Sequence, residues 1–187
     1  MSSVPSTARA SRTRRDIIDA AISVWSAANP ASLGEVADAA GVGRTTVNRY
    51  FSDRTSLVAA VNDECRERFG RAVERARPGE GSGLEALQRV CTEIIELGAV
   101  LGLIFADNAL VDPDTWTENE DEDPIGLLVM RGLTDGSIAS DLPAEWVAIS
   151  VWTSLFAAWL LISTAAGTRH EASQLLVRTL ASGIAPG

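Results

Sequence analysis

The stretch from Trp146 to Thr168 carries no charged side chain. It is long enough to cross a bilayer, which takes about 20 mainly apolar residues in a helix. However, it also contains several Ser and Thr residues, and no basic cluster flanks it to set an orientation. The same composition suits a helix that is buried between its own core and a partner subunit. Both folds fit the stretch, and we favour the buried helix of a protein that does not enter a membrane.

Apolar side chains recur at helical spacing along most of the chain. In the first helix, which we expect from Arg12 onward, Ile17, Ala21 and Trp25 fall at four-residue steps, and Asn29-Pro30 ends it. The spacing predicts later helices over 54–77, 84–106, 124–132, 143–166 and 171–182. Because no strand-like alternation of any length is present, the sequence predicts an all-α fold.

Two short helices joined by glycines are predicted between Ser32 and Phe51. Ser32 can cap the first of them, with Glu35 reaching back to complete a capping box. Gly41 supplies the left-handed residue that ends this helix, and Gly43 allows a new helix to start, which we expect from Thr45 to Phe51. A helix, a glycine turn and a second helix form the layout of a helix-turn-helix that places its second helix in the major groove of DNA.

The second of these helices has a polar face that suits DNA bases. Once Val47 and Phe51 are buried, the side chains left to face outward are Arg44, Thr45, Asn48 and Arg49. Asn can pair with adenine, Arg with guanine, and a Thr methyl can touch the methyl of thymine. Tyr50 and Arg54 lie at the far end, where they would reach phosphates together with the N–H groups that open the next helix. Alternatively, the segment is a helical hairpin that never meets DNA.

Charge divides the chain into two parts. The net charge is −9, but up to Arg77 there are 12 arginines against 9 acidic residues, and from Pro78 onward 4 against 16. Only the first part suits DNA phosphates. Residues 1–11 are rich in Ser, Ala and Arg without periodicity, which predicts a flexible basic arm.

The segment from Ala31 to Val61 resembles the DNA-binding region of the TetR family of bacterial regulators, and residues 14–25 resemble its usual first helix. The resemblance implies a helix-turn-helix domain over 12–58 and a helical ligand-binding and dimerisation domain over 59–187, in a cytoplasmic protein. It implies that the third helix reads the operator with Arg44, Thr45, Thr46, Asn48, Arg49 and Tyr50. Arg54 stands where the family usually has a phosphate-contacting Lys.

Three positions depart from the family pattern. Gly43 stands where a capping Ser is common, Thr45 where Gly is common, and Asn48 where an aromatic residue is usual. Because these positions lie in and beside the reading helix, the target sequence of a relative cannot be transferred to this chain.

The resemblance implies that the last two long helices, over 143–166 and 171–182, pair with those of a second subunit in a homodimer. That pairing also accounts for the uncharged stretch. The family's ligand pocket lies among the central helices, and we expect an apolar or amphipathic small molecule there. The candidate lining residues, each of which also suits ordinary core packing, are Phe105, Asn108, Trp116, Trp152 and Phe156.

Catalytic and metal-binding patterns are not found in the sequence. Cys65 and Cys91 have no His or second pair nearby, the acidic segment 112–123 lacks EF-hand spacing, and His170 has no partner for catalysis. We therefore expect no enzyme activity, metal or cofactor. The expected function is that of a repressor that a small molecule releases from a palindromic operator; the alternative is a helical small-molecule-binding protein that does not bind DNA.

Overall fold

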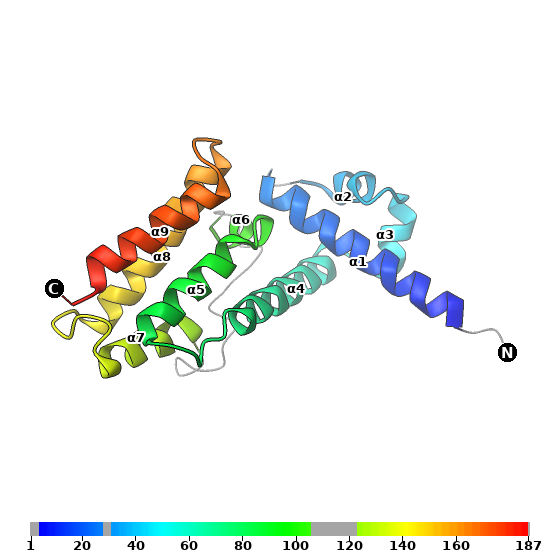
Figure 1. Cartoon of the computed structure of the whole chain (residues 1–187). Helices are drawn as coiled ribbons and strands as arrows, with labels where there is room; N and C mark the ends of the chain where they lie inside the picture. The colour runs from blue at the N-terminus through cyan, green and yellow to red at the C-terminus, as the bar shows by residue number, and fades with distance from the viewer. Residues whose placement is uncertain (1–3, 28–30, 106–122, 187) are drawn as a thin grey trace. The chain divides into compact units, whose positions relative to one another are not determined.

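The computed structural model describes residues 4–27, 31–105 and 123–186, and every helix or strand in these ranges is an α-helix, as predicted (Figure 1). The helices are α1 (Val4–Ala27), α2 (Leu33–Ala39), α3 (Arg44–Tyr50), α4 (Arg54–Arg75), α5 (Gly83–Ile95), α6 (Ala99–Phe105), α7 (Pro124–Asp135), α8 (Ala144–Ser163) and α9 (Arg169–Ile184).

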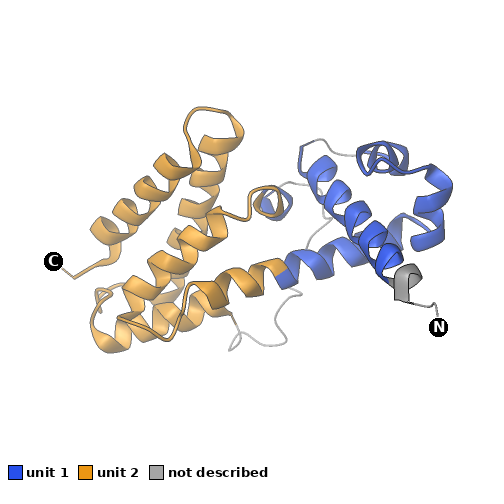
Figure 2. Ribbon diagram, turned by 45° about the vertical axis from the view of Figure 1, so that its right-hand side comes forward, with its two compact units in different colours: residues 1–67, 102–112 blue, residues 68–101, 113–187 orange. Residues whose placement is uncertain are grey.

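The chain forms two compact units (Figure 2). The first comprises residues 1–67 and 102–112, and the second comprises residues 68–101 and 113–187. The division falls within α4, nine residues beyond the end of the domain that the sequence predicted over 12–58.

The first unit packs α1 against α2, and α2 against α3. Its core is apolar because each helix turns one stripe of side chains inward. The buried residues include Ile17, Ile18, Ile22, Trp25, Val36, Ala37, Val47, Phe51, Leu57 and Val61. The indole Nε1 of Trp25 donates a hydrogen bond to the carbonyl of Ala31 at 3.2 Å, which ties the end of α1 to the start of α2.

The first helix is longer than predicted. It begins at Val4, so residues 4–11 are helical and the expected flexible arm over 1–11 is wrong for them. Within this segment Ala8, Arg9 and Ala10 are strong helix formers. The hydroxyl of Thr13 also donates to the carbonyl of Arg9 at 3.1 Å, one helical turn away. The predicted stop at Asn29-Pro30 lies outside the described residues.

The second unit is built around α5, which contacts α7, α8 and α9. The helices α8 and α9 also pack against each other and run side by side (Figure 1). The buried residues of this unit include Leu87, Val90, Ile94, Ile125, Val129, Val147, Val151, Leu155, Leu176 and Leu180.

The turn between α4 and α5 is held firmly by two arginines. Arg89 of α5 donates hydrogen bonds of 2.6 to 3.1 Å, and Arg131 of α7 donates two short ones. The accepting carbonyls are those of Ala76, Arg77 and Glu80 for Arg89, and those of Pro78 and Gly81 for Arg131. The glycine-rich connection between α4 and α5 is therefore a turn with defined contacts.

The start of α5 lies directly against α7. Gly83 is buried, and a Cβ at this position would overlap the backbone of Gly132. The N–H of Gly83 donates to the Asp135 carboxylate at 2.7 Å, and the N–H of Leu84 donates to the Ser137 hydroxyl at 3.0 Å. The absence of a side chain at Gly83 therefore permits close approach of the two helices.

The single helix predicted over 84–106 is wrong, because the structure divides it into α5 and α6. Gly98 has φ +55°, a left-handed conformation that glycine adopts without steric cost and that ends a helix. The apolar spacing continues on both sides of the break, and this is why the periodicity did not reveal it.

Candidate nucleic-acid interface

The turn before α3 is built by the predicted local signals. The Ser32 hydroxyl accepts the Glu35 N–H at 3.3 Å, and the Glu35 carboxylate accepts the Ser32 N–H at 2.7 Å. These bonds to Ser32 lower the pKa of Glu35. Gly41 has φ +65°, as its predicted role requires, and Gly43 is the N-cap of α3 without a side-chain bond. The helix α3 thus starts at Arg44, one residue earlier than predicted.

The helix α3 has one buried side and one open side. Val47 is 0% exposed and Phe51 is 3% exposed, so both belong to the core as predicted. On the open side, Arg44, Thr45, Asn48 and Arg49 are exposed, whereas Thr46 and Tyr50 are half-buried. The predicted reading residues therefore lie on one short helix whose polar face is accessible to DNA.

Two arginines, one in α3 and one in α1, rest on aromatic rings. The Cζ atom of Arg49 lies 5.2 Å from the centre of the Tyr50 ring, and that of Arg14 in α1 lies 5.3 Å from the centre of the Phe51 ring. Such cation–π contacts restrict a long side chain and leave the edge of the guanidinium free for an anion. Arg14 of α1 is thereby placed beside the end of α3.

Arg54 has an internal role that the sequence did not reveal. Its Nη1 atom donates to the carbonyl of Ala31 at 2.7 Å, and its Cζ atom lies 5.0 Å from the centre of the Trp25 ring. The side chain is half-buried and joins α4 to the end of α1. A guanidinium has five N–H donors, so Arg54 keeps further donors beside the one bonded to Ala31. Its contact with phosphate remains a prediction.

The start of α4 is capped by the carboxylate of Asp53, the residue before the helix. Asp53 Oδ1 accepts the Ser56 N–H at 2.8 Å, and the Asp53 N–H is 3.3 Å from the Ser56 hydroxyl. The bond from the Ser56 N–H is the main reason that the pKa of Asp53 is lowered. One of the N–H groups that the sequence assigned to an anion is therefore already used.

The structure describes three of the five predicted ligand-binding residues, namely Phe105, Trp152 and Phe156. Asn108 and Trp116 lie outside the described ranges, and Phe105 is a half-buried residue of the first unit. In the second unit, the ring of Trp152 stacks on that of Phe69 with centres 6.4 Å apart. Phe156 is 40% exposed. These assignments stay predictions.

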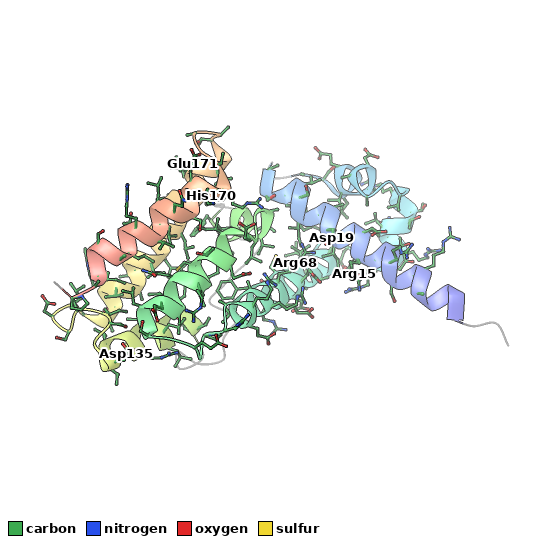
Figure 3. The ribbon with its side chains drawn as sticks, in the orientation of Figure 1. Arg15, Asp19, Arg68, Asp135, His170 and Glu171 are labelled. Atoms are coloured by element: carbon green, nitrogen blue, oxygen red, sulfur yellow. The ribbon has the colours of Figure 1, made fainter. Side chains whose placement is uncertain are left out.

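A hollow of about 510 Å³ is present at the surface of α8 and α9, and none of the predicted ligand residues lines it. Its lining residues are Leu161, Ala166, Gly167, Glu171, Gln174, Leu175 and Arg178. Glu171 also caps α9 together with Thr168, and it lies at the start of that helix (Figure 3).

An apolar stripe on α8 faces away from the core of the subunit. Trp146, Ile149, Phe156 and Leu160 are 61%, 54%, 40% and 45% exposed, and their spacing places them on one side of the helix. By length and composition α8 could cross a membrane, since its mean hydropathy reaches 1.7 over an 18-residue window. Only 22% of that window is buried within the subunit, so the stripe is accessible to a partner.

The described residues contain no cluster of three or more His, Cys, Asp and Glu side chains that could hold a metal ion. Cys65 and Cys91 are buried free thiols. Burial raises the pKa of the Cys91 thiol to about 12, so this group stays protonated and unreactive at neutral pH.

Comparison with known proteins decides the family. Residues 17–61 match the family model of bacterial regulatory proteins of the tetR family. The chain is 33% identical over 176 residues to the HTH-type transcriptional repressor LfrR of Mycolicibacterium smegmatis, a match that covers 92% of this chain and 90% of the relative. The chain belongs to the TetR family.

Solved structures agree with the assignment to this family. The LfrR regulator of Mycobacterium smegmatis in complex with proflavine has a TM-score of 0.71 at 30% identity, over 94% of this chain and 99% of that one. A gamma-butyrolactone receptor has a TM-score of 0.75 at 22% identity, over 95% and 90% of the two chains, and this likeness shows the fold alone.

As a TetR-family member, the chain is a ligand-responsive, DNA-binding transcriptional regulator and not an enzyme. Regulators of this family bind DNA and small molecules and act as dimers. The alternative of a helical small-molecule-binding protein that does not bind DNA is not favoured.

Proposed function

We propose that two copies of this chain repress transcription in the cytoplasm by binding a palindromic operator, each through α3. The observation that carries the proposal is the open polar face of α3, on which Arg44, Thr45, Asn48 and Arg49 are all exposed. Two such helices related by a two-fold axis would enter successive major grooves about 34 Å apart. Exposed Asn and Arg on a rigid helix supply the paired donors and acceptors that distinguish bases in that groove.

The two copies would join through α8 and α9. The stripe on α8 is apolar and largely exposed in one subunit, and Leu175 of α9, 43% exposed, adds to it. A two-fold axis along this side pairs each stripe with its own copy, which is the usual geometry of a homodimer. Small residues such as Ala157, an exposed residue of α8, let the paired helices approach closely.

We propose an amphipathic aromatic cation as the ligand. From Pro78 onward acidic residues exceed arginines by 16 to 4, which favours the approach of a cation. The related LfrR structure was solved with proflavine, a planar aromatic amine, which is therefore a suitable test compound. Ligand binding would release the operator if the ligand prefers a dimer whose recognition helices are wrongly spaced.

The proposal is tested by selecting bound fragments from random duplex DNA and then comparing two variants on the selected site. Asn48→Ala should lose about 1–3 kcal/mol of operator preference if the amide reads a base. Gln174→Ala, an exposed amide of α9, is the matched control and should leave the preference unchanged.

Adding proflavine to the complex should release the DNA. No enrichment of any sequence by the wild-type dimer at low salt would contradict DNA recognition. An enriched site that Asn48→Ala binds with full preference would remove Asn48 from the reading set while leaving the function in place.

A further inference from the structure

The arginines whose side chains lack partners are concentrated in the DNA-binding unit. Most described arginines form ion pairs, donate to carbonyls or rest on aromatic rings. Within the described ranges, the guanidinium groups with no hydrogen bond, ion pair or ring contact are those of Arg9, Arg12, Arg15, Arg44 and Arg178. Four of these five belong to the unit that carries α3.

Three of the four lie on the first turns of α1. Arg9, Arg12 and Arg15 are all exposed, and their three-residue spacing places them along one stripe of the helix. Figure 3 shows Arg15 on this helix. Asp16 and Asp19 follow four residues after Arg12 and Arg15, and the part of α1 from Val4 to Arg15 carries four arginines and no acidic residue.

The helix that carries this stripe is fixed beside α3. Arg14, between Arg12 and Arg15 in sequence, rests on the ring of Phe51, which is the C-cap of α3. From Arg14, the helix continues without interruption to Val4, about 15 Å further at 1.5 Å per residue. Helical geometry places the arginine stripe on the solvent side of this rigid helix, turned away from the side on which Arg14 contacts Phe51.

We propose that Arg9, Arg12 and Arg15 bind the phosphates of DNA next to the segment that α3 reads. The proposal rests on the proposed function, because it assigns these residues to the same DNA complex. Unpartnered guanidinium groups are well suited to phosphate oxygens, which they can bind in a bidentate manner. Such contacts carry no sequence information, and they raise affinity for every duplex that is long enough to reach them.

The test compares two triple variants on the selected operator. Arg9→Gln, Arg12→Gln and Arg15→Gln together remove the stripe, while Gln keeps the length and helix preference of the side chain. The control carries Arg71→Gln, Arg75→Gln and Arg77→Gln, which remove the same charge from exposed positions of the second unit outside α8 and α9. The dissociation constant is measured against salt concentration for both variants and the wild type.

The expected result is a flatter salt dependence for the α1 variant only. Each phosphate contact contributes about 0.9 to the slope of log K against log salt, so six arginines in the dimer reduce its magnitude by up to about 5. Trimming the duplex outside the operator should weaken the wild type and leave the α1 variant unaffected. The preference for operator over random DNA should persist in all three proteins.

Two results would overturn the inference. If the α1 variant keeps the wild-type slope and the wild-type response to trimming, the stripe does not touch DNA, although recognition by α3 still stands. If the control variant loses as much slope as the α1 variant, the effect belongs to net charge and not to the stripe. A wild-type protein that binds no duplex would instead refute the proposed function itself.

Discussion

Substitution of Gly83 by alanine should weaken the contact between α5 and α7 severely. The new Cβ would lie 2.9 Å from the carbonyl carbon of Arg131 and closer still to the backbone nitrogen and Cα of Gly132. Ordinary carbon contacts are 3.5–4.0 Å, and backbone atoms cannot rotate aside as the end of a side chain can. The two helices would have to separate by roughly 1 Å to restore ordinary contacts.

Two costs add in this variant. Overpacking of a close contact costs about 1–3 kcal/mol. Separation would also stretch the bond from the Gly83 N–H to the Asp135 carboxylate, which adds to the loss. Alanine recovers about 0.4–1 kcal/mol by restricting the unfolded chain. A net loss of about 2 kcal/mol is expected, or roughly 4–8 °C in Tm for a chain of this length.

Thermal unfolding followed by circular dichroism at fixed protein concentration measures this effect. Gly79→Ala is the matched control, because its Cβ meets nothing within 4 Å and Gly79 does not need a left-handed conformation. The control should unfold at or slightly above the wild-type temperature. Equal Tm values for Gly83→Ala and Gly79→Ala would refute the close packing of α5 on α7.

Two further predictions concern assembly and pH. Leu160→Glu places an unpaired charge in the proposed interface, at a cost of about 3 kcal/mol, and should raise the dimer dissociation constant about 100-fold; an unchanged constant by analytical ultracentrifugation would place the interface elsewhere. The pKa values of Asp53 and Glu171 are lowered because backbone N–H groups donate to them, so their stabilisation is present above about pH 4 and is lost as the pH falls through the folded values. Acid unfolding curves measure this effect. Between pH 5 and pH 3 the Glu171→Gln variant should lose less unfolding free energy than the wild type, by on the order of one protonation; an equal loss would contradict this account.

The local parts of the fold could be predicted from the sequence. The capping box of Ser32 and Glu35 joins residues three apart, and the left-handed turn at Gly41 depends on one residue. The burial of Val47 and Phe51 follows from helical spacing alone, so the prediction of an open polar face on α3 is confirmed.

Features that depend on distant residues could not be predicted. The bond from Arg54 to the Ala31 carbonyl spans 23 positions, and those from Arg131 to the α4–α5 turn span 50 or more. No periodicity encodes such contacts. The same holds for the ligand site, since the shape of a cavity depends on how whole helices pack and not on the spacing within one of them.

The five carbonyls held by Arg89 and Arg131 determine how movement can pass through the second unit. A glycine-rich loop would absorb a shift of α5 or α7 by changing its own backbone angles. Because the carbonyls of this turn are bonded to both helices, the turn resists such changes. A ligand that displaces α5 or α7 should therefore also move the end of α4. The helix α4 is uninterrupted back to Arg54, which is three residues after the C-cap of α3. A displacement of the end of α4 thus acts on a helix that begins next to α3.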